Sequence, residues 1–305
     1  MTTLQDRLAR NEVIIVDGAT GTELERRGVP MNDVAWSGAA ILTHADTLRD
    51  VHADYIRAGA DIIITNTFAT TRFMLEAAGL GSKTRDINVA AVTIAKQARD
   101  RAAGDREVWI AGSISPMAPE ADREKRPEVS TAGASFREQA EILAAAGVDL
   151  IMLEMMRDIT YTAAAIDAAT ATGLPVWVGF SVVSLATGEI VMVPGIVDDL
   201  AFGDGLGLAM EHGGCLVAIM HTEVEDTGPA LEIARKNWPG PLGAYPHSGH
   251  FVMPHWQFDS VISPEAYLVK AQDWVAMGVQ VIGGCCGIGP DHIRLLAERL
   301  PKTLP

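Results

Sequence analysis

Apolar residues gather in eight short runs spread along the chain. Most of the runs are continuous rather than alternating, which is typical of strands buried on both faces of a parallel sheet. We therefore expect strands over residues 13–18, 61–67, 108–114, 150–156, 176–182, 216–222, 241–247 and 279–286.

Segments with a helical spacing of apolar residues lie between these runs. The clearest cover residues 45–58, 85–103, 135–146, 264–277 and 291–300. Several end in a glycine-containing turn, such as AGAD at 58–61 and AGVD at 146–149, where glycine suits the left-handed conformation of a helix C-cap. The repeat continues without a linker or a low-complexity stretch, so residues 1–305 are predicted to form a single domain.

Eight strand–helix units predict an α/β protein with the (β/α)8 TIM-barrel fold. The alternative is an open, doubly wound sheet, which would carry a glycine-rich phosphate turn after its first strand. The segment DGATGTE at 17–23 is not of the GxGxxG form. The longest irregular stretches, 115–134, 183–199 and 248–263, all follow strands. In a barrel they would therefore lie at the face that carries the active site.

The composition is that of a globular enzyme, with 48% apolar and 21% charged residues among 305. No apolar run approaches the ~20 residues that a membrane-spanning helix needs. The first residues, MTTLQDRLARNEV, are charged and lack the apolar centre of a signal peptide. We expect a cytoplasmic protein, either a monomer or a small homo-oligomer.

The net charge of −15 comes from 24 basic and 39 acidic residues. Such a chain repels phosphate, so nucleic acids and anionic membranes are excluded as expected partners. The three cysteines are an odd number, and Cys285 and Cys286 are adjacent. Neighbouring cysteines rarely pair with each other, so no disulfide framework is expected and the thiols are free for metal binding or chemistry.

Polar residues stand at the ends of nearly all the predicted strands. In a barrel these strand ends converge on one mouth. A single polar residue at a strand end is explained equally well by a function or by the chain leaving the apolar interior there. Polar residues at the ends of eight strands together favour a functional site. The residues are Asp17, Thr65, Asn66, Thr67, Ser113, Glu154, Ser181, His221, Thr222, His247, Cys285 and Cys286.

The Cys285–Cys286 pair, within IGGCCGIG, is the most informative of these features. A lone buried cysteine is most often a small apolar filler. Side chains alternate along a strand, so two adjacent cysteines can face one ion only if the chain leaves β geometry, which the flanking glycines permit. Two thiolates and a third nitrogen or sulfur ligand form a Zn²⁺ site with one open position, as in catalytic zinc enzymes.

Five segments resemble the homocysteine S-methyltransferase family in order and spacing. They are DGATGTELERRG at 17–28, DIIITNTF at 61–68, LIMLEM at 150–155, YPHSG at 245–249 and VIGGCCGIGPDHI at 281–293. The family includes betaine–homocysteine methyltransferase and the homocysteine domain of cobalamin-dependent methionine synthase. The resemblance covers nearly the whole chain and implies a (β/α)8 barrel.

The resemblance implies a zinc site, of which two of the three family cysteines carry over, as Cys285 and Cys286. The third position, at the end of the sixth strand, is His221. Cys215 lies six residues earlier, about 20 Å away along a strand, so it is not expected to bind the metal. His221 is the predicted third ligand; the alternatives are a degraded metal site, or His247, present where the family usually has asparagine, as the ligand.

The resemblance also implies which residues contact the substrate. Glu154 is expected to bind the amino group of an amino-acid thiol. Residues near the first two strands are expected to bind the carboxylate of the same substrate. The expected substrate-binding residues are Asp17, Gly18, Thr65, Asn66, Thr67, Glu154 and His247. Two departures from the family pattern, GSISP at the third strand and Gly179–Phe180 at the fifth, concern the donor side. Tyr245 and Trp256 are candidates to pack around a methylated cation.

The predicted function is zinc-dependent methyl transfer from a small sulfonium or betaine donor to a zinc-bound thiol, with homocysteine as acceptor and methionine as product. The partners are therefore a small-molecule thiol and a small methyl donor. Two alternatives remain open: a methyltransferase or demethylase for another small thiol or methylated donor, and a non-catalytic zinc-binding barrel.

Overall fold

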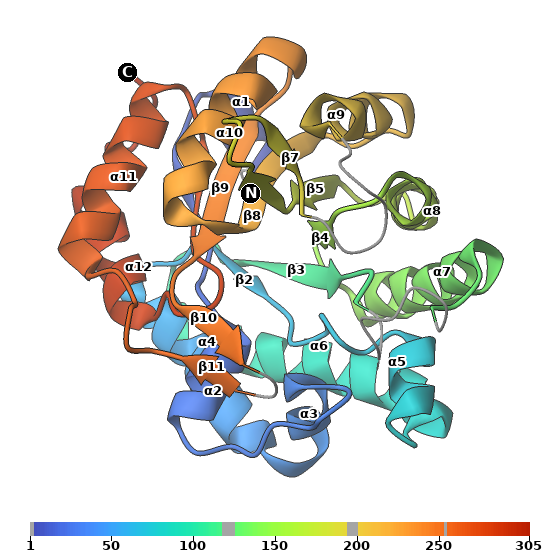
Figure 1. Ribbon diagram of the computed structural model, residues 1–305. Helices are drawn as coiled ribbons and strands as arrows, with labels where there is room; N and C mark the ends of the chain where they lie inside the picture. Colours follow the sequence, from blue (N-terminus) through green and yellow to red (C-terminus); the bar gives the residue numbers. More distant parts are fainter. Residues whose placement is uncertain (1–2, 118–125, 194–200, 253–254) are drawn as a thin grey trace.

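The computed structural model describes residues 3–117, 126–193, 201–252 and 255–305. Eight parallel strands form one sheet in the order β1-β12-β9-β8-β5-β4-β3-β2. A bridge between Val16 and Ile62 joins β1 to β2, which brings the sheet round into a barrel (Figure 1). The strands are β1 Ile14–Ile15, β2 Ile62–Ile64, β3 Trp109–Ile114, β4 Leu150–Met156, β5 Val176–Phe180, β8 Leu216–Glu223, β9 Leu242–His247 and β12 Val281–Ile282. The predicted (β/α)8 barrel is confirmed.

A ring of helices surrounds the barrel, with one long helix after each strand (Figure 1). Each helix packs against the next, and α12 packs against α4 to complete the ring. The ring consists of α4 Ala45–Ala58, α6 Thr84–Ala102, α7 Val129–Ala146, α8 Ile159–Thr170, α9 Phe202–Glu211, α10 Val224–Asn237, α11 Pro264–Ala276 and α12 Pro290–Arg299. Gly59 and Gly147 cap α4 and α7 in the left-handed conformation, as predicted.

Successive side chains of the strands divide between two apolar layers. In β8, Leu216, Ala218 and Met220 point into the barrel, while Val217 and Ile219 point outward to the helices. The alternation follows from the two-residue period of a strand, and it explains why the strands read as continuous apolar runs. The inner layer fills the barrel below its mouth, so the open end carries the chemistry.

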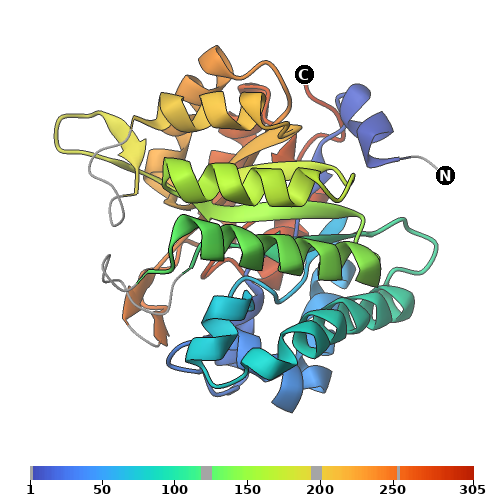
Figure 2. The same cartoon turned by 90° about the vertical axis from the view of Figure 1, so that its right-hand side faces the viewer.

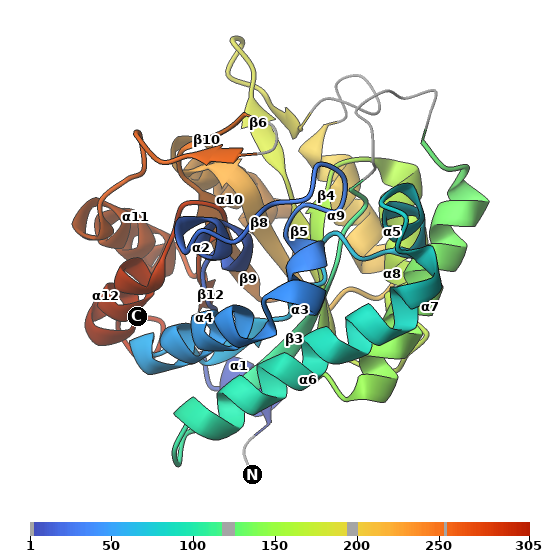
Figure 3. The ribbon, with the colours of Figure 1, turned by 90° about the horizontal axis from the view of Figure 1, so that it is seen from below.

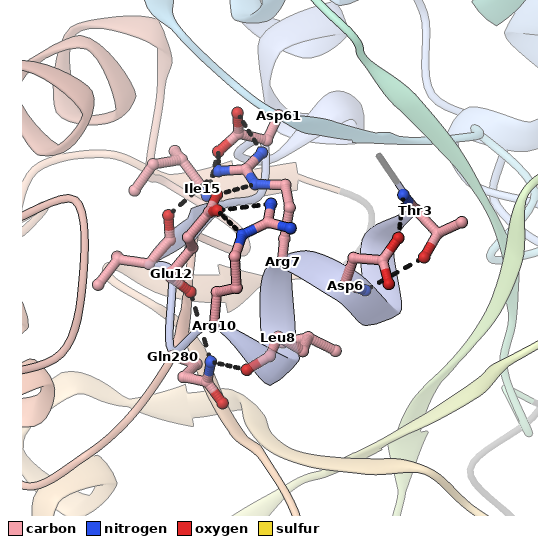
Figure 4. Close-up of polar contacts among 10 residues, drawn as sticks. Thr3, Asp6, Arg7, Leu8, Arg10, Glu12, Ile15, Asp61 and Gln280 are labelled. Carbon is pink, nitrogen blue, oxygen red and sulfur yellow. Dashed lines mark hydrogen bonds and ion pairs between the residues drawn. The ribbon is translucent and has the colours of Figure 1, made fainter. Parts of the chain in front are cut away.

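The short helix α1, Leu4–Ala9, closes the opposite end of the barrel (Figure 3). Leu4 packs in the inner apolar layer. The helix is held by an ion pair of 2.9 Å between Arg7 and Asp61, and by the Gln280 amide, which donates to the Leu8 carbonyl over 2.9 Å (Figure 4). With this end closed, access to the interior is from the carboxyl ends of the strands.

Two of the predicted irregular stretches contain β-hairpins. The antiparallel pairs are β6 Val182–Ser184 with β7 Ile190–Met192, and β10 His250–Val252 with β11 His255–Gln257. Both hairpins lie at the end of the barrel away from α1 (Figures 2 and 3). The predicted stretch 115–134 also contains the start of α7, which the sequence VSTAG at 129–133 hides because of its glycine and β-branched residues.

Short helices fill the loops of the barrel, and none of the described helices is long and apolar enough to cross a bilayer. The shorter elements are α2 Thr20–Arg26, η1 Ser37–Ala39, α3 Ala40–Thr43, α5 Arg72–Ala77 and η2 Gly81–Lys83.

Candidate metal and substrate site

A cavity of about 510 Å³ opens at the carboxyl ends of the strands. Segments that are far apart in the sequence meet around it, from the loop after β1 to the loop after β12. Of the predicted site residues, those that line it are Gly18, Thr65, Asn66, Glu154, His221, His247, Cys285 and Cys286. The barrel therefore gathers most of the predicted residues into one enclosed space.

The two cysteines lie in a tight loop beyond β12, which ends at Ile282 rather than at the predicted residue 286. The loop is pinned on both sides, because the Cys285 amide donates to the Pro246 carbonyl over 2.8 Å and the Ser248 amide to the Cys286 carbonyl over 2.9 Å. Gly287, at φ +84°, touches the neighbouring loop so closely that a Cβ atom there would lie 2.0 Å from the Ser248 carbonyl oxygen. The predicted departure from β geometry is thus present.

His221 reaches the mouth through a bulge near the end of β8. The register between β8 and β9 shifts between Met220 and Glu223, and His221 has a φ of +44°. In a regular strand Thr222 would continue the inward series of Leu216, Ala218 and Met220. Instead the Thr222 hydroxyl accepts from the Val182 amide over 3.0 Å. A bulge re-aims side chains in this way, and here it brings His221 to the cysteines.

The ligand atoms of His221, Cys285 and Cys286 all lie within 4.8 Å of one another. The Cys285 Sγ and His221 Nδ1 atoms are 3.8 Å apart. Tetrahedral zinc, with Zn–S of about 2.3 Å and Zn–N of about 2.0 Å, holds neighbouring ligand atoms about 3.5–3.8 Å apart, so the donor set and its spacing fit such an ion. Cys215 is remote from the cluster, and its thiol donates to the Val176 carbonyl at the start of β5.

The two thiols differ in their acidity. A hydrogen bond from Cys286, together with the neighbouring His221, holds the pKa of Cys285 well below its usual range. The same hydrogen bond, together with burial, raises the pKa of Cys286. One thiolate therefore forms readily at this position, which is what a cation-binding site requires.

His247 stands beside this cluster and does not belong to it. Its ring lies 4.9 Å from the ring of His221, measured between centroids, and its Nε2 atom is 3.0 Å from the Glu223 carboxylate. Its buried Nδ1 atom has no hydrogen-bond partner among the described residues. The Trp256 ring packs edge-on against it at 5.5 Å. His247 therefore contacts His221 from outside the cluster.

Glu154 faces the other side of the cavity and is almost fully buried. Burial and the negative charge of Cys285 raise its pKa to about 8, although a hydrogen bond from the Ser113 hydroxyl opposes the shift. Ser113 in turn accepts at its carbonyl from the Thr67 hydroxyl over 2.7 Å, and Thr67 pairs with Thr65 over 2.7 Å. The Ser113 hydroxyl thus holds the carboxyl group, and Thr67 holds the backbone of Ser113.

Asp17 and Thr67 are buried outside the described cavity lining. One Asp17 oxygen accepts from the Ile64 amide over 2.9 Å, while the other is buried without a hydrogen-bond partner among the described residues. Desolvation raises the pKa of Asp17 well above its usual value.

Gly18 has no room for a side chain, because a Cβ atom would lie 2.2 Å from the Ile288 carbonyl oxygen. Asn66 exchanges hydrogen bonds of 2.9 Å with Ser37.

Sequence reasoning missed several cavity residues. Trp36 and Phe251 join Trp256 in a row of edge-on and tilted aromatic rings, while Tyr245 lies in the inner apolar layer and not in the lining. Tyr245 also occupies the space beside Gly179, where a Cβ atom would meet its hydroxyl at 2.5 Å.

Arg157, directly after β4, also lines the cavity and was not predicted. Its position at the end of a strand was the signal in the sequence that could have identified it.

The chain matches a known enzyme family over nearly its whole length. The homocysteine S-methyltransferase family matches residues 14–300. Homocysteine S-methyltransferase YbgG of Bacillus subtilis is 28% identical over 328 residues, which cover 97% of each chain. Selenocysteine Se-methyltransferase of Brassica oleracea var. italica is 28% identical over 313 residues, 94% of this chain and 88% of its own.

A solved structure extends the agreement to the fold. The metallated form of the homocysteine methyltransferase MmuM from Escherichia coli superposes with a TM-score of 0.79 at 27% identity, covering 97% of this chain and 99% of that one. The family match spans nearly the whole barrel, from β1 to the end of α12. The chain therefore belongs to the homocysteine S-methyltransferase family and is a methyltransferase.

Proposed function

We propose that residues 1–305 act as one barrel that transfers a methyl group from a small sulfonium or betaine donor to a thiol in a zinc-dependent reaction. The proposed acceptor is homocysteine and the product methionine. The observation that carries the proposal is the cluster of His221, Cys285 and Cys286, whose ligand atoms lie within 4.8 Å of one another at the mouth of the barrel.

In this proposal, Cys285 and Cys286 hold the ion as thiolates and His221 as a neutral imidazole. Zn²⁺ bound to such a set supplies positive charge that lowers the pKa of a thiol in its open position. The chain's own part is geometric. The pinned loop after β12 fixes the two sulfurs, and the bulge at His221 fixes the imidazole. His247 keeps that imidazole in place through ring contact, with Glu223 orienting His247 in turn.

Binding of the acceptor would use β4 and the segments after β1 and β2. Glu154 is proposed to receive the amino group, because a buried carboxyl group is stabilised as a carboxylate when a cation pairs with it. Gly18, Thr65 and Asn66 would contact the substrate carboxylate, while Asp17 and Thr67 support the wall from behind. Trp256, with Trp36 and Phe251, is proposed to face the methylated cation of the donor.

The zinc requirement is tested by measuring metal content and methyl transfer in single variants. Cys285→Ser, Cys286→Ser and His221→Ala are each expected to lose zinc and activity. Cys215→Ser is the matched control, since its sulfur lies outside the cluster, and it should retain both. Mass spectrometry of the thiol products gives the activity. Full methyl transfer by a protein that holds no zinc would rule the proposal out.

A second candidate is the same reaction with another small thiol or selenol as acceptor. The observation that favours it is His221, because replacing a thiolate by a neutral imidazole makes the centre one unit more positive, so the bound acceptor sulfur is more acidic but less nucleophilic. A panel of thiols and donors separates the two. His221→Cys should shift the preference toward homocysteine if the imidazole sets the acceptor.

A further inference from the structure

Arg157 is a cation in the cavity wall that has no partner among the described residues. It is the only lysine or arginine among the described residues that line the cavity. It forms no ion pair or hydrogen bond with any described residue, and its Nε atom is buried. A guanidinium group that loses water on burial without gaining a protein partner is destabilised, so a ligand is the natural candidate to complete it.

A carboxylate and a second guanidinium group lie near Arg157. Asp158 is the adjacent carboxylate, but it forms no ion pair with Arg157. One of its oxygens accepts from the Tyr161 amide over 2.7 Å, and the other lies 3.8 Å from Arg126 without a hydrogen-bond partner among the described residues. Burial lowers the pKa of Arg157, and the charge of Arg126 lowers it further. No described residue, Asp158 included, therefore neutralises Arg157 by direct contact.

We propose that Arg157 binds the carboxylate of the methyl donor and so selects zwitterionic donors, such as an amino-acid sulfonium or a betaine. The inference rests on the proposed function. The planar guanidinium matches a carboxylate in a two-pronged hydrogen bond. The polar groups proposed for the acceptor are Gly18 after β1, Thr65 and Asn66 after β2, and Glu154 within β4. Arg157 is not among them, which leaves it for the second substrate.

The experiment compares two methyl donors: S-methylmethionine, which carries a carboxylate and an ammonium group, and trimethylsulfonium, which carries neither. Arg157→Met should lower kcat/KM for S-methylmethionine by about 10- to 100-fold, mainly through KM, as expected for the loss of a charge-assisted hydrogen bond. The value for trimethylsulfonium should change by less than about twofold. Arg157→Lys should recover part of the loss. Arg137→Met, an exposed charge change on α7, is the control.

Equal losses with both donors would overturn the inference and give Arg157 a structural role. A rise confined to the KM of the thiol would overturn it as well, since the carboxylate would then belong to the acceptor. Calorimetric titration of wild-type and Arg157→Met protein with each donor tests the inference without turnover. The variant should bind S-methylmethionine more weakly than wild-type protein does and trimethylsulfonium equally well, and the absence of that difference would refute the inference. If the difference is present but no methyl group moves, the proposed function fails while the anion site stands.

Discussion

Glu154 offers a test of how the site recognises an amino-acid substrate. Its pKa is raised to about 8, chiefly by burial and next by the charge of Cys285. A carboxyl group with a raised pKa pairs with a substrate ammonium only after it has lost its proton. The affinity for an amino acid should therefore rise with pH up to about pH 8 and level off above it. Glu154→Gln should abolish this dependence.

The size of the effect follows from the pKa. At pH 7 about one carboxyl group in ten is ionised, and at pH 6 about one in a hundred, so the affinity should change by close to tenfold between them. This corresponds to about 1.4 kcal/mol per pH unit. Zinc should shift the dependence to lower pH, because it offsets the charge of Cys285 that helps to raise the pKa of Glu154.

The assay is calorimetric titration of chelator-treated protein with methionine, which has no titrating side chain. Titrations at pH 6, 7 and 8 in buffers of different ionisation enthalpy report the proton released on binding, expected to be about 0.9 per ligand at pH 7. Glu154→Gln should bind with an affinity that is flat over this range. If Glu154→Gln keeps the wild-type slope, another group titrates and Glu154 does not receive the amino group.

Three further predictions concern stability and the metal loop. His52 is fully buried and has no hydrogen-bond partner among the described residues, and burial lowers its pKa to about 4. Below pH 6.5 the unfolded chain gains a proton at this histidine and the folded chain does not. Between pH 7.5 and pH 5, wild-type protein should therefore lose about 2 kcal/mol more stability than His52→Leu, as measured by urea unfolding. Gly287 has a positive φ, and a Cβ atom there would lie 2.0 Å from the Ser248 carbonyl oxygen, so Gly287→Ala should displace the loop after β12 and lower zinc content. The control is Gly188→Ala, because Gly188 has the same φ of +84° but faces open space, and this variant should leave zinc content unchanged. Tyr245→Phe should keep zinc content within about twofold, because Tyr245 lies in the inner apolar layer, and a large loss of zinc would contradict that placement.

Much of the fold is readable from the chain without its structure. Strands buried on both faces appear as continuous apolar runs, so β4 and β8 were located to within one residue at each end. The helices α4, α6, α11 and α12 were located as closely, because an amphipathic period is a local property. The cysteine pair also stands out locally, since two adjacent thiols among glycines fit neither a strand nor a disulfide.

What the tertiary structure decided is the direction in which the site residues point. A strict strand alternation through β8 sends Thr222 inward and His221 outward, and only the register shift against β9 reverses the two. That Arg157 has no partner in the described parts of the chain likewise depends on which groups from other segments surround it. These features depend on contacts between segments far apart along the chain. A local pattern of apolar and polar residues does not determine such contacts.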